Sequence, residues 1–196
     1  MLEFIQITKH KVNKLFFLLI YKNSFKKFGA NSTISFPFQV EGAKYINIGK
    51  KVHIHKYSWL LGLKTNKVTP TLVIHENTYI GRFVHIVCVN KIEVKKNVLI
   101  SDKVYISDNL HDYRDIRTPI KNQKIITKGE VVIGEQTWLG ENVCVIGASV
   151  GKHCVIGANS VVLHDIPDYS VAIGSPAIVI KKFNKTKNIW EKIDNS

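Results

Sequence analysis

Large aliphatic residues recur every six positions through most of this chain, a spacing that neither an α-helix nor an amphipathic strand produces. In the C-terminal half the rhythm runs through Ile133, Leu139 and Val145, and it continues from Val150 after one five-residue step. Its earlier members are Ile74, Ile80, Ile86, Ile92, Val94, Ile100 and Ile106. A three-sided prism fits this period if each side takes six residues and turns one aliphatic side chain inward. The pattern therefore predicts a parallel β-helix, an all-β solenoid.

The first part of the chain, residues 1–30, lacks this rhythm and predicts an amphipathic helix. The segment Thr8–Phe28 has no glycine or proline, and it mixes six lysines with apolar residues. Two interpretations of the helix stay open and are compatible with each other. It can cover the end of the solenoid, which solenoids need, or it can lie on an anionic membrane through its apolar face.

The solenoid domain is expected over residues 31–182, with its first full turn at residues 46–54. Residues 57–71 depart from the rhythm and predict a loop or an imperfect turn. The tail, residues 183–196, is expected to form a short helix around Ile189 and Trp190.

Residues 107–129 break the six-residue pattern completely. They are polar, contain Pro119, and bring histidine, aspartate, tyrosine and arginine side chains together. A long irregular excursion from a compact domain is usually either functional or disordered. We therefore expect a protruding loop here, and we look for chemistry in it.

The composition favours an anionic partner and a reducing compartment. The net charge is +13, which suits nucleic acid, anionic lipid or a phosphorylated small molecule. No nucleic-acid-binding motif is present, and no block of five like charges occurs, so the excess charge is expected to be spread out. The three cysteines, Cys88, Cys144 and Cys154, make no disulfide framework and are expected to be buried thiols. The apolar run of residues 15–21 is too short to span a bilayer. We expect a cytoplasmic protein, with peripheral contact at the inner face of the membrane as an option.

Two stretches carry a family resemblance. Residues 131–182, with their ending Asp165-Ile-Pro167 followed by Gly174-Ser-Pro176, resemble the C-terminal half of hexapeptide-repeat acetyltransferases, such as those for galactosides, maltose, serine and xenobiotics. Residues 85–113 resemble more narrowly the O-acetyltransferases of bacterial cell-surface polysaccharides. The resemblance implies a left-handed parallel β-helix, a homotrimer, and transfer of acetyl from acetyl-CoA with no metal.

Acetyl transfer to a hydroxyl needs a base, because an alcohol is a poor nucleophile until its proton is removed. Histidine titrates near neutrality, and of the eight histidines only His111 lies at the start of the irregular loop, just where the coils break. The family's catalytic histidine holds the same place, so His111 is the predicted general base. Relatives often have Asp-His-x-His here, whereas this chain has Asp108-Asn109-Leu110-His111. No cysteine lies near the loop in sequence, so direct attack on the thioester is expected.

The acceptor is expected to contact Asn90, Asp108 and Tyr113. Asp108 has three open roles: orienting the imidazole, binding an acceptor hydroxyl, or shaping a turn, since aspartate favours turns. Asn90 has two, a sugar contact or a place in a solenoid corner.

The coenzyme residues follow from the resemblance alone. Trp138 matches an aromatic residue beside the pantetheine arm, and Lys181 matches a basic residue near the nucleotide phosphates. The remaining positions that match residues lining the coenzyme are Glu141, Ala158, Leu163 and His164. An exposed aromatic packing on the next subunit is the alternative for Trp138.

A sugar hydroxyl of capsule, lipopolysaccharide or exopolysaccharide is the first choice of acceptor. A nucleotide-sugar amine, an antibiotic or serine are alternatives within acetyltransferases, although residues 1–30 are too short for the N-terminal domain that nucleotide-sugar enzymes usually carry. A γ-type carbonic anhydrase would need three histidines converging on zinc. A non-catalytic β-helix is the other remote alternative, and it has no use for the histidine-bearing loop.

Overall fold

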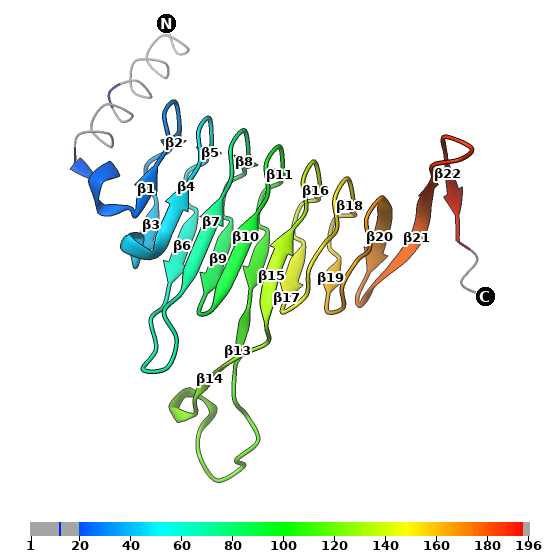
Figure 1. Ribbon diagram of the computed structural model, residues 1–196. Helices are drawn as coiled ribbons and strands as arrows, with labels where there is room; N and C mark the ends of the chain where they lie inside the picture. Colours follow the sequence, from blue (N-terminus) through cyan, green and yellow to red (C-terminus); the bar gives the residue numbers. More distant parts are fainter. Residues whose placement is uncertain (1–11, 13–19, 194–196) are drawn as a thin grey trace, which may run out of the picture.

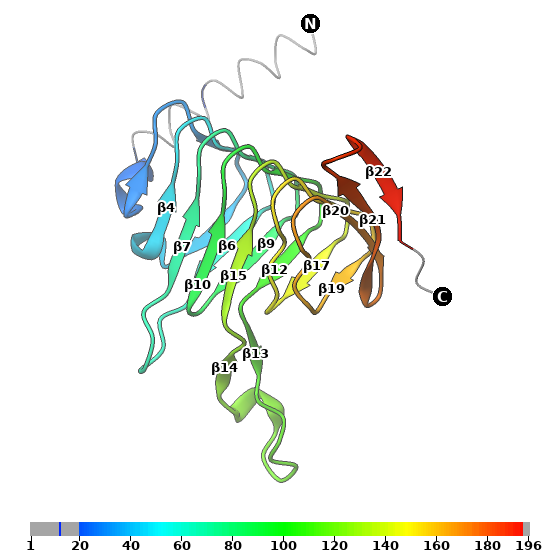
Figure 2. The same ribbon diagram turned by 45° about the vertical axis from the view of Figure 1, so that its right-hand side comes forward.

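The chain winds into a triangular prism with one strand of each coil on each side (Figure 1, Figure 2). The structure is a computed structural model that describes Val12 and residues 20–193. Three parallel sheets form the sides, and we call them sheets A, B and C in the order in which each coil meets them. The parallel sheets, the six-residue period and the near absence of helix among the described residues fit the expected left-handed β-helix. No helix in the part of the chain that the structure describes is long and apolar enough to cross a membrane.

Sheet A has five strands, in the order β1 (Lys27–Phe28), β4 (Ile46–Ile48), β7 (Thr71–Ile74), β10 (Lys91–Val94) and β15 (Glu130–Ile133). Sheet C runs from β3 (Gln39–Glu41) through β6 (Trp59–Gly62), β9 (His85–Cys88), β12 (Tyr105–Ser107) and β17 (Cys144–Ile146) to β19 (Val161–Val162). Sheet B begins with β2 (Thr33–Ile34), β5 (His53–Ile54), β8 (Tyr79–Ile80), β11 (Leu99–Ile100), β16 (Trp138–Leu139), β18 (Val155–Ile156) and β20 (Ser170–Gly174). Short turns join the sides, and we name these corners A–B, B–C and C–A after the sheets they connect.

The core consists of aliphatic columns, because each strand turns one face inward and the coils are in register. On sheet B, Ile54, Ile80 and Ile100 stack directly upon one another, and all three are buried. Equivalent columns on the other two sheets include Ile74, Val94 and Ile133 on sheet A, and Ile86, Ile106 and Val145 on sheet C. The six-residue rhythm is therefore the step from one sheet to the next, as predicted.

Both ends of the solenoid differ from the sequence expectation. Most of the predicted N-terminal helix lies outside the described residues, and its last part is a 3-10 turn, η1 (Lys22–Ser24), followed by β1. The solenoid thus starts one coil before residues 46–54, and a second 3-10 turn, η2 (Ala43–Tyr45), leads into β4. The predicted tail helix is wrong: β21 (Ala177–Asn184) and β22 (Ile189–Lys192) form an antiparallel hairpin that extends sheet B.

Two insertions leave the prism at the C–A corner (Figure 1). Residues 57–71 are more regular than predicted, because β6 takes its place in sheet C and only residues 63–70 form a loop. The expected loop at 107–129 does protrude, and it is a hairpin of β13 (Asn109–His111) and β14 (Ile125–Thr127) with a 3-10 turn, η3 (Ile120–Asn122), near its tip.

Candidate functional site

His111 ends the first strand of the protruding hairpin. It pairs with Ile125 across the hairpin, and its side chain is exposed. The next residue, Asp112, donates its backbone N–H to the carbonyl of Lys124 at 2.8 Å, which continues the pairing past His111. The histidine is therefore an accessible side chain on an ordered two-stranded stem.

Asp108 holds the base of this stem and is fully buried. Its carboxylate accepts the backbone N–H of Val89 at 2.9 Å and that of Asn90 at 2.7 Å. The side-chain amide of Asn109 donates to the same carboxylate at 2.9 Å. With these donors around it and no exposed surface, the carboxylate serves the turn of the preceding coil. The expectation that Asp108 contacts the acceptor is thus not favoured, and the turn role fits.

Asn109 braces the same region where relatives often have a histidine. Its amide also donates to the carbonyl of Val87 at 3.1 Å, and its backbone exchanges two hydrogen bonds with the hydroxyl of Ser107. On the return strand, the backbone N–H of Lys128 donates to the carbonyl of Asp108 at 2.8 Å. Both ends of the hairpin are therefore fixed to the prism.

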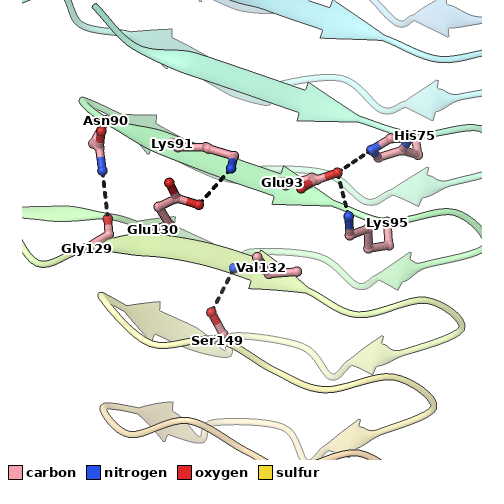
Figure 3. A network of polar contacts seen from close by, with 9 residues as sticks. All are labelled: His75, Asn90, Lys91, Glu93, Lys95, Gly129, Glu130, Val132 and Ser149. Atoms are coloured by element: carbon pink, nitrogen blue, oxygen red, sulfur yellow. Dashed lines mark hydrogen bonds and ion pairs between the residues drawn. The ribbon is translucent and has the colours of Figure 1, made fainter. Parts of the chain in front are cut away.

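Asn90 and Tyr113 lie on the two sides of His111. Asn90 sits at the C–A corner, partly exposed, and its amide reaches the carbonyl of Gly129 at 3.4 Å (Figure 3). Tyr113 is 65% exposed, farther along the hairpin. Between His111 and Tyr113, the carboxylate of Asp112 is bound by the guanidinium of Arg114, which holds the pKa of Asp112 below its usual range. The sequence analysis missed this ion pair.

Cys88 also lies at the base of the hairpin, contrary to the expectation that no cysteine is near it. Its sulfur is 3.7 Å from the Asp108 carboxylate. Burial and the neighbouring Asp108 charge raise the pKa of this thiol to about 12, so it is not a thiolate nucleophile near neutral pH. Burial also raises the pKa of Cys154. These thiols favour direct transfer over a covalent acetyl-enzyme.

Trp138 is the centre of two shallow grooves on sheet B. Its ring is 46% exposed, and its indole N–H donates to the hydroxyl of Ser101 at 2.9 Å. One groove, of about 520 Å³, runs toward the B–C corner and is lined by Tyr79, Leu99, Trp138, Glu141 and Ala158. The other, of about 430 Å³, runs toward the C-terminal hairpin and is lined by Trp138, His153, Lys181 and Trp190. Four predicted coenzyme residues thus lie along one path, and Tyr79, Leu99 and Ser101 are neighbours that the sequence analysis did not name.

The other two predicted coenzyme residues, Leu163 and His164, lie elsewhere. They are exposed at the C–A corner, on the same edge of the prism as the hairpin with His111. In a triangular prism the C–A corner is opposite sheet B. One chain therefore divides the predicted residues into two groups, with Asn90, His111 and His164 on one edge, and Trp138 and Lys181 on the opposite side.

Histidine and acidic side chains do not gather elsewhere into a metal site. Among the described residues, no three histidine, cysteine, aspartate or glutamate side chains lie close enough together to hold a metal ion.

Known proteins resemble this chain in sequence and in fold. Residues 130–164 match a family described as the hexapeptide repeat of succinyl-transferase. The chain is 32% identical over 167 residues to the putative lipopolysaccharide biosynthesis O-acetyl transferase WbbJ of Escherichia coli (strain K12), covering 81% of this chain and 83% of that protein. It is 38% identical over 146 residues to the probable acetyltransferase Rv3034c of Mycobacterium tuberculosis, which covers 73% of this chain and 44% of that longer protein.

The solved structures include AntD, an N-acyltransferase from Bacillus cereus in complex with dTDP and coenzyme A. It superposes with a TM-score of 0.71 at 20% identity, over 86% of this chain and 90% of that one. At this identity the likeness concerns the fold.

Proposed function

This chain belongs to the hexapeptide-repeat acetyltransferases and is an acyltransferase that uses a coenzyme A thioester, and from that premise we propose that it acetylates a sugar hydroxyl of a bacterial surface polysaccharide or its precursor. The observation that carries the proposal is His111, an exposed histidine on a stem that is fixed to the prism at both ends. The 32% identity to a protein named as a lipopolysaccharide O-acetyl transferase supports oxygen as the acceptor atom.

In this mechanism His111 takes the proton of the acceptor hydroxyl while that oxygen attacks the thioester carbonyl of acetyl-CoA. The new C–O bond forms, a backbone N–H of the solenoid stabilises the oxyanion, and the C–S bond then breaks. The proton on His111 passes to the departing sulfur. Asn90 and Tyr113 flank the base on the acceptor side, and Trp138, Glu141, Ala158, Leu163, His164 and Lys181 hold the coenzyme. Asp108 and Asn109 position the stem.

The division of these residues supports a homotrimer with each site between two chains. His111 and the groove at Trp138 cannot serve one reaction in the same chain, because they lie on opposite sides of the prism. Sheet C lies between the C–A corner, which carries His111, and the B–C corner, which carries Glu141 and Ala158. If copies pack through sheet C, the C–A corner of one chain comes beside the B–C corner of the next. Three such contacts close a ring.

The outward side of sheet C suits such a contact. A column of large rings, Trp59, His85 and Tyr105, runs across its strands in register. Trp59 and His85 stack with their centroids 4.2 Å apart, and His85 and Tyr105 follow at 5.4 Å. A continuous apolar surface of this kind marks an interface in a protein of this size.

The test is acetyl-CoA consumption, measured as free thiol release against a panel of oligosaccharides and polymers, with wild type beside His111→Ala. We expect one acceptor class to release thiol, and His111→Ala to lower the rate on the order of 10²–10⁴ while coenzyme A binding and oligomeric mass stay unchanged. Near-normal turnover in His111→Ala would remove the base from the mechanism. Turnover only with amino sugars would replace the hydroxyl with an amine, and failure to bind coenzyme A would reject the reaction.

A further inference from the structure

The positive charge of this protein is concentrated at one end, contrary to the sequence expectation of an even spread. Residues 20–70, which form the first two coils, contain nine lysines and a single acidic residue, Glu41. The ion pairs of the described residues all lie within residues 71–193. Within the described part of the chain, the lysines of the N-terminal end are therefore not neutralised by carboxylates.

Three of these lysines share one groove. Lys27, Lys50 and Lys51 line a cleft of about 740 Å³ where sheet A meets the A–B corner, together with Asn47 and Asn77. The only acidic side chain along this groove is Glu76. Such a groove attracts phosphate groups through several ammonium groups at once.

Exposed aromatic rings lie at the same end of the solenoid, on the B–C corner. Phe36, Tyr57 and Phe83 occupy this corner in three successive coils and are 60%, 49% and 51% exposed. The rings of Tyr57 and Phe83 stack with centroids 4.9 Å apart, and the ammonium of Lys56 lies 5.6 Å from the centre of the Tyr57 ring.

The backbone at this corner makes these rings more informative than ordinary surface aromatics. Tyr57 and Phe83 have φ angles of 65° and 56°, in the left-handed region that bulky residues disfavour. Farther along the same corner the equivalent positions hold Asn142 and Asn159, which tolerate this conformation. Large rings thus stand exposed, without burial to offset their strain, at the end where the lysines gather. Strained and exposed residues of this kind point to a function.

We propose that the N-terminal end of the solenoid docks on an anionic lipid bilayer, with the lysines facing lipid phosphates and Phe36, Tyr57 and Phe83 entering the headgroup region. Lysines combined with aromatic rings are the side chains that proteins place at a membrane interface. Unpaired lysines near an anionic surface each add to the attraction, and they do so less as salt rises. A soluble polyanion would account for the lysines, but it would leave the strained rings in water.

The test is flotation of the full chain with vesicles of phosphatidylglycerol and phosphatidylcholine in equal parts, compared with phosphatidylcholine alone. We expect wild type to bind the anionic vesicles at about 0.1 M salt, to release at about 0.5 M salt, and to ignore the neutral ones. Tyr57→Asn/Phe83→Asn should weaken binding about tenfold and fold at least as well, because asparagine already fills equivalent corners. Lys50→Gln/Lys51→Gln should weaken binding by about tenfold or more.

The matched control is Lys185→Gln/Lys187→Gln, which removes the same charge at the opposite end and should bind as wild type does. The proposal fails if wild type ignores anionic vesicles, or if the aromatic and the lysine variants both bind as tightly as wild type. It also fails if the aromatic variant loses oligomeric mass while vesicle binding persists, since the rings would then belong to a contact between copies. Vesicle binding and thiol release are separate measurements, so failure of the acetyl-transfer proposal leaves this result readable.

Discussion

The outward faces of sheets A and C differ, although their inward faces carry the same aliphatic columns. On sheet A the outward side chains are charged and paired: Lys91 binds Glu130 at 2.7 Å, and Glu93 accepts from both His75 and Lys95 (Figure 3). On sheet C the corresponding column is Trp59, His85 and Tyr105, which contact one another instead of charged partners. Two of its polar atoms, the indole nitrogen of Trp59 and Nε2 of His85, are buried without a hydrogen-bond partner among the described residues.

The difference teaches that the inward pattern fixes the coil while the outward pattern assigns each side its environment. Charged pairs remain solvated on sheet A and add little stability. Stacked rings on sheet C lose contact with water, and an unpartnered indole N–H is tolerated best where apolar surface is gained in return. Sheet A is built to face water, and sheet C is built to be covered.

The strongest way to break the comparison is to place the same charge on each face. Tyr105→Lys on sheet C should separate the chains and lower activity by about 10²–10⁴, as His111→Ala does, because each proposed site needs two chains. Val73→Lys, at an outward position of sheet A, is the matched control and should keep mass and activity. Light scattering and thiol release measure both. If Tyr105→Lys stays assembled and active, sheet C is not the contact.

A second prediction concerns the inward columns, where the two sheets should behave alike. Ile74→Ala on sheet A and Ile86→Ala on sheet C each leave a cavity in a fully buried column. Each should lower the free energy of unfolding by about 2–5 kcal/mol, which denaturant titration measures. A large difference between the two would mean that the outward face also sets the strength of the core beneath it.

A third prediction uses pH to separate the faces. Burial lowers the pKa of His85 in the folded protein, so its neutral form is favoured there, and stability falls as pH drops below the unfolded value of about 6.5. We expect the Tm of wild type to fall by a few degrees between about pH 7.5 and pH 5.5. His85→Phe, which keeps a ring in the column, should lose less, and equal losses would exclude His85 as the cause.

On sheet A the same acidification should change little. Lys95 and His75 hold the pKa of Glu93 below its usual range, so its contribution is kept until pH falls below about 4.5.

The smallest effect is expected from the exposed pair on sheet A. Lys91→Ala removes the partner of Glu130, yet the Tm should stay close to that of wild type, since solvent and salt screen exposed pairs. Differential scanning calorimetry at low and high salt measures this. A clear drop in Tm at both salt concentrations would contradict the view that these pairs mainly keep the face soluble.

The sequence predicted the regular coils well because one aliphatic residue per side is enough to specify them. It failed where the rhythm is carried by other residues. The first coil uses Thr33 and Ile34, with no Ile-Gly steps to mark it. At the C-terminus, Asn188 takes a φ of 55° in the turn between β21 and β22, and this turn was overlooked in favour of a helix around Trp190.

The candidate site was predictable residue by residue, whereas its arrangement was not. His111 stands out because it lies where the rhythm breaks. The burial of Asp108 was hidden, because its partners Val89 and Asn90 belong to the preceding coil. The ring column of sheet C was also hidden, since the insertion at residues 63–70 puts Trp59 and His85 out of step in the sequence although they are neighbours in the fold.

All coils of this solenoid advance in one direction along one axis, from β1 to β20 (Figure 1). In a ring of three chains related by rotation about an axis parallel to theirs, the three lysine-rich ends would point the same way. A weak contact made three times at once becomes avidity, because after one end binds, the other two meet the surface at high effective concentration. A modest affinity per chain would then suffice to hold the assembly upright, with each acceptor groove opening toward the bilayer.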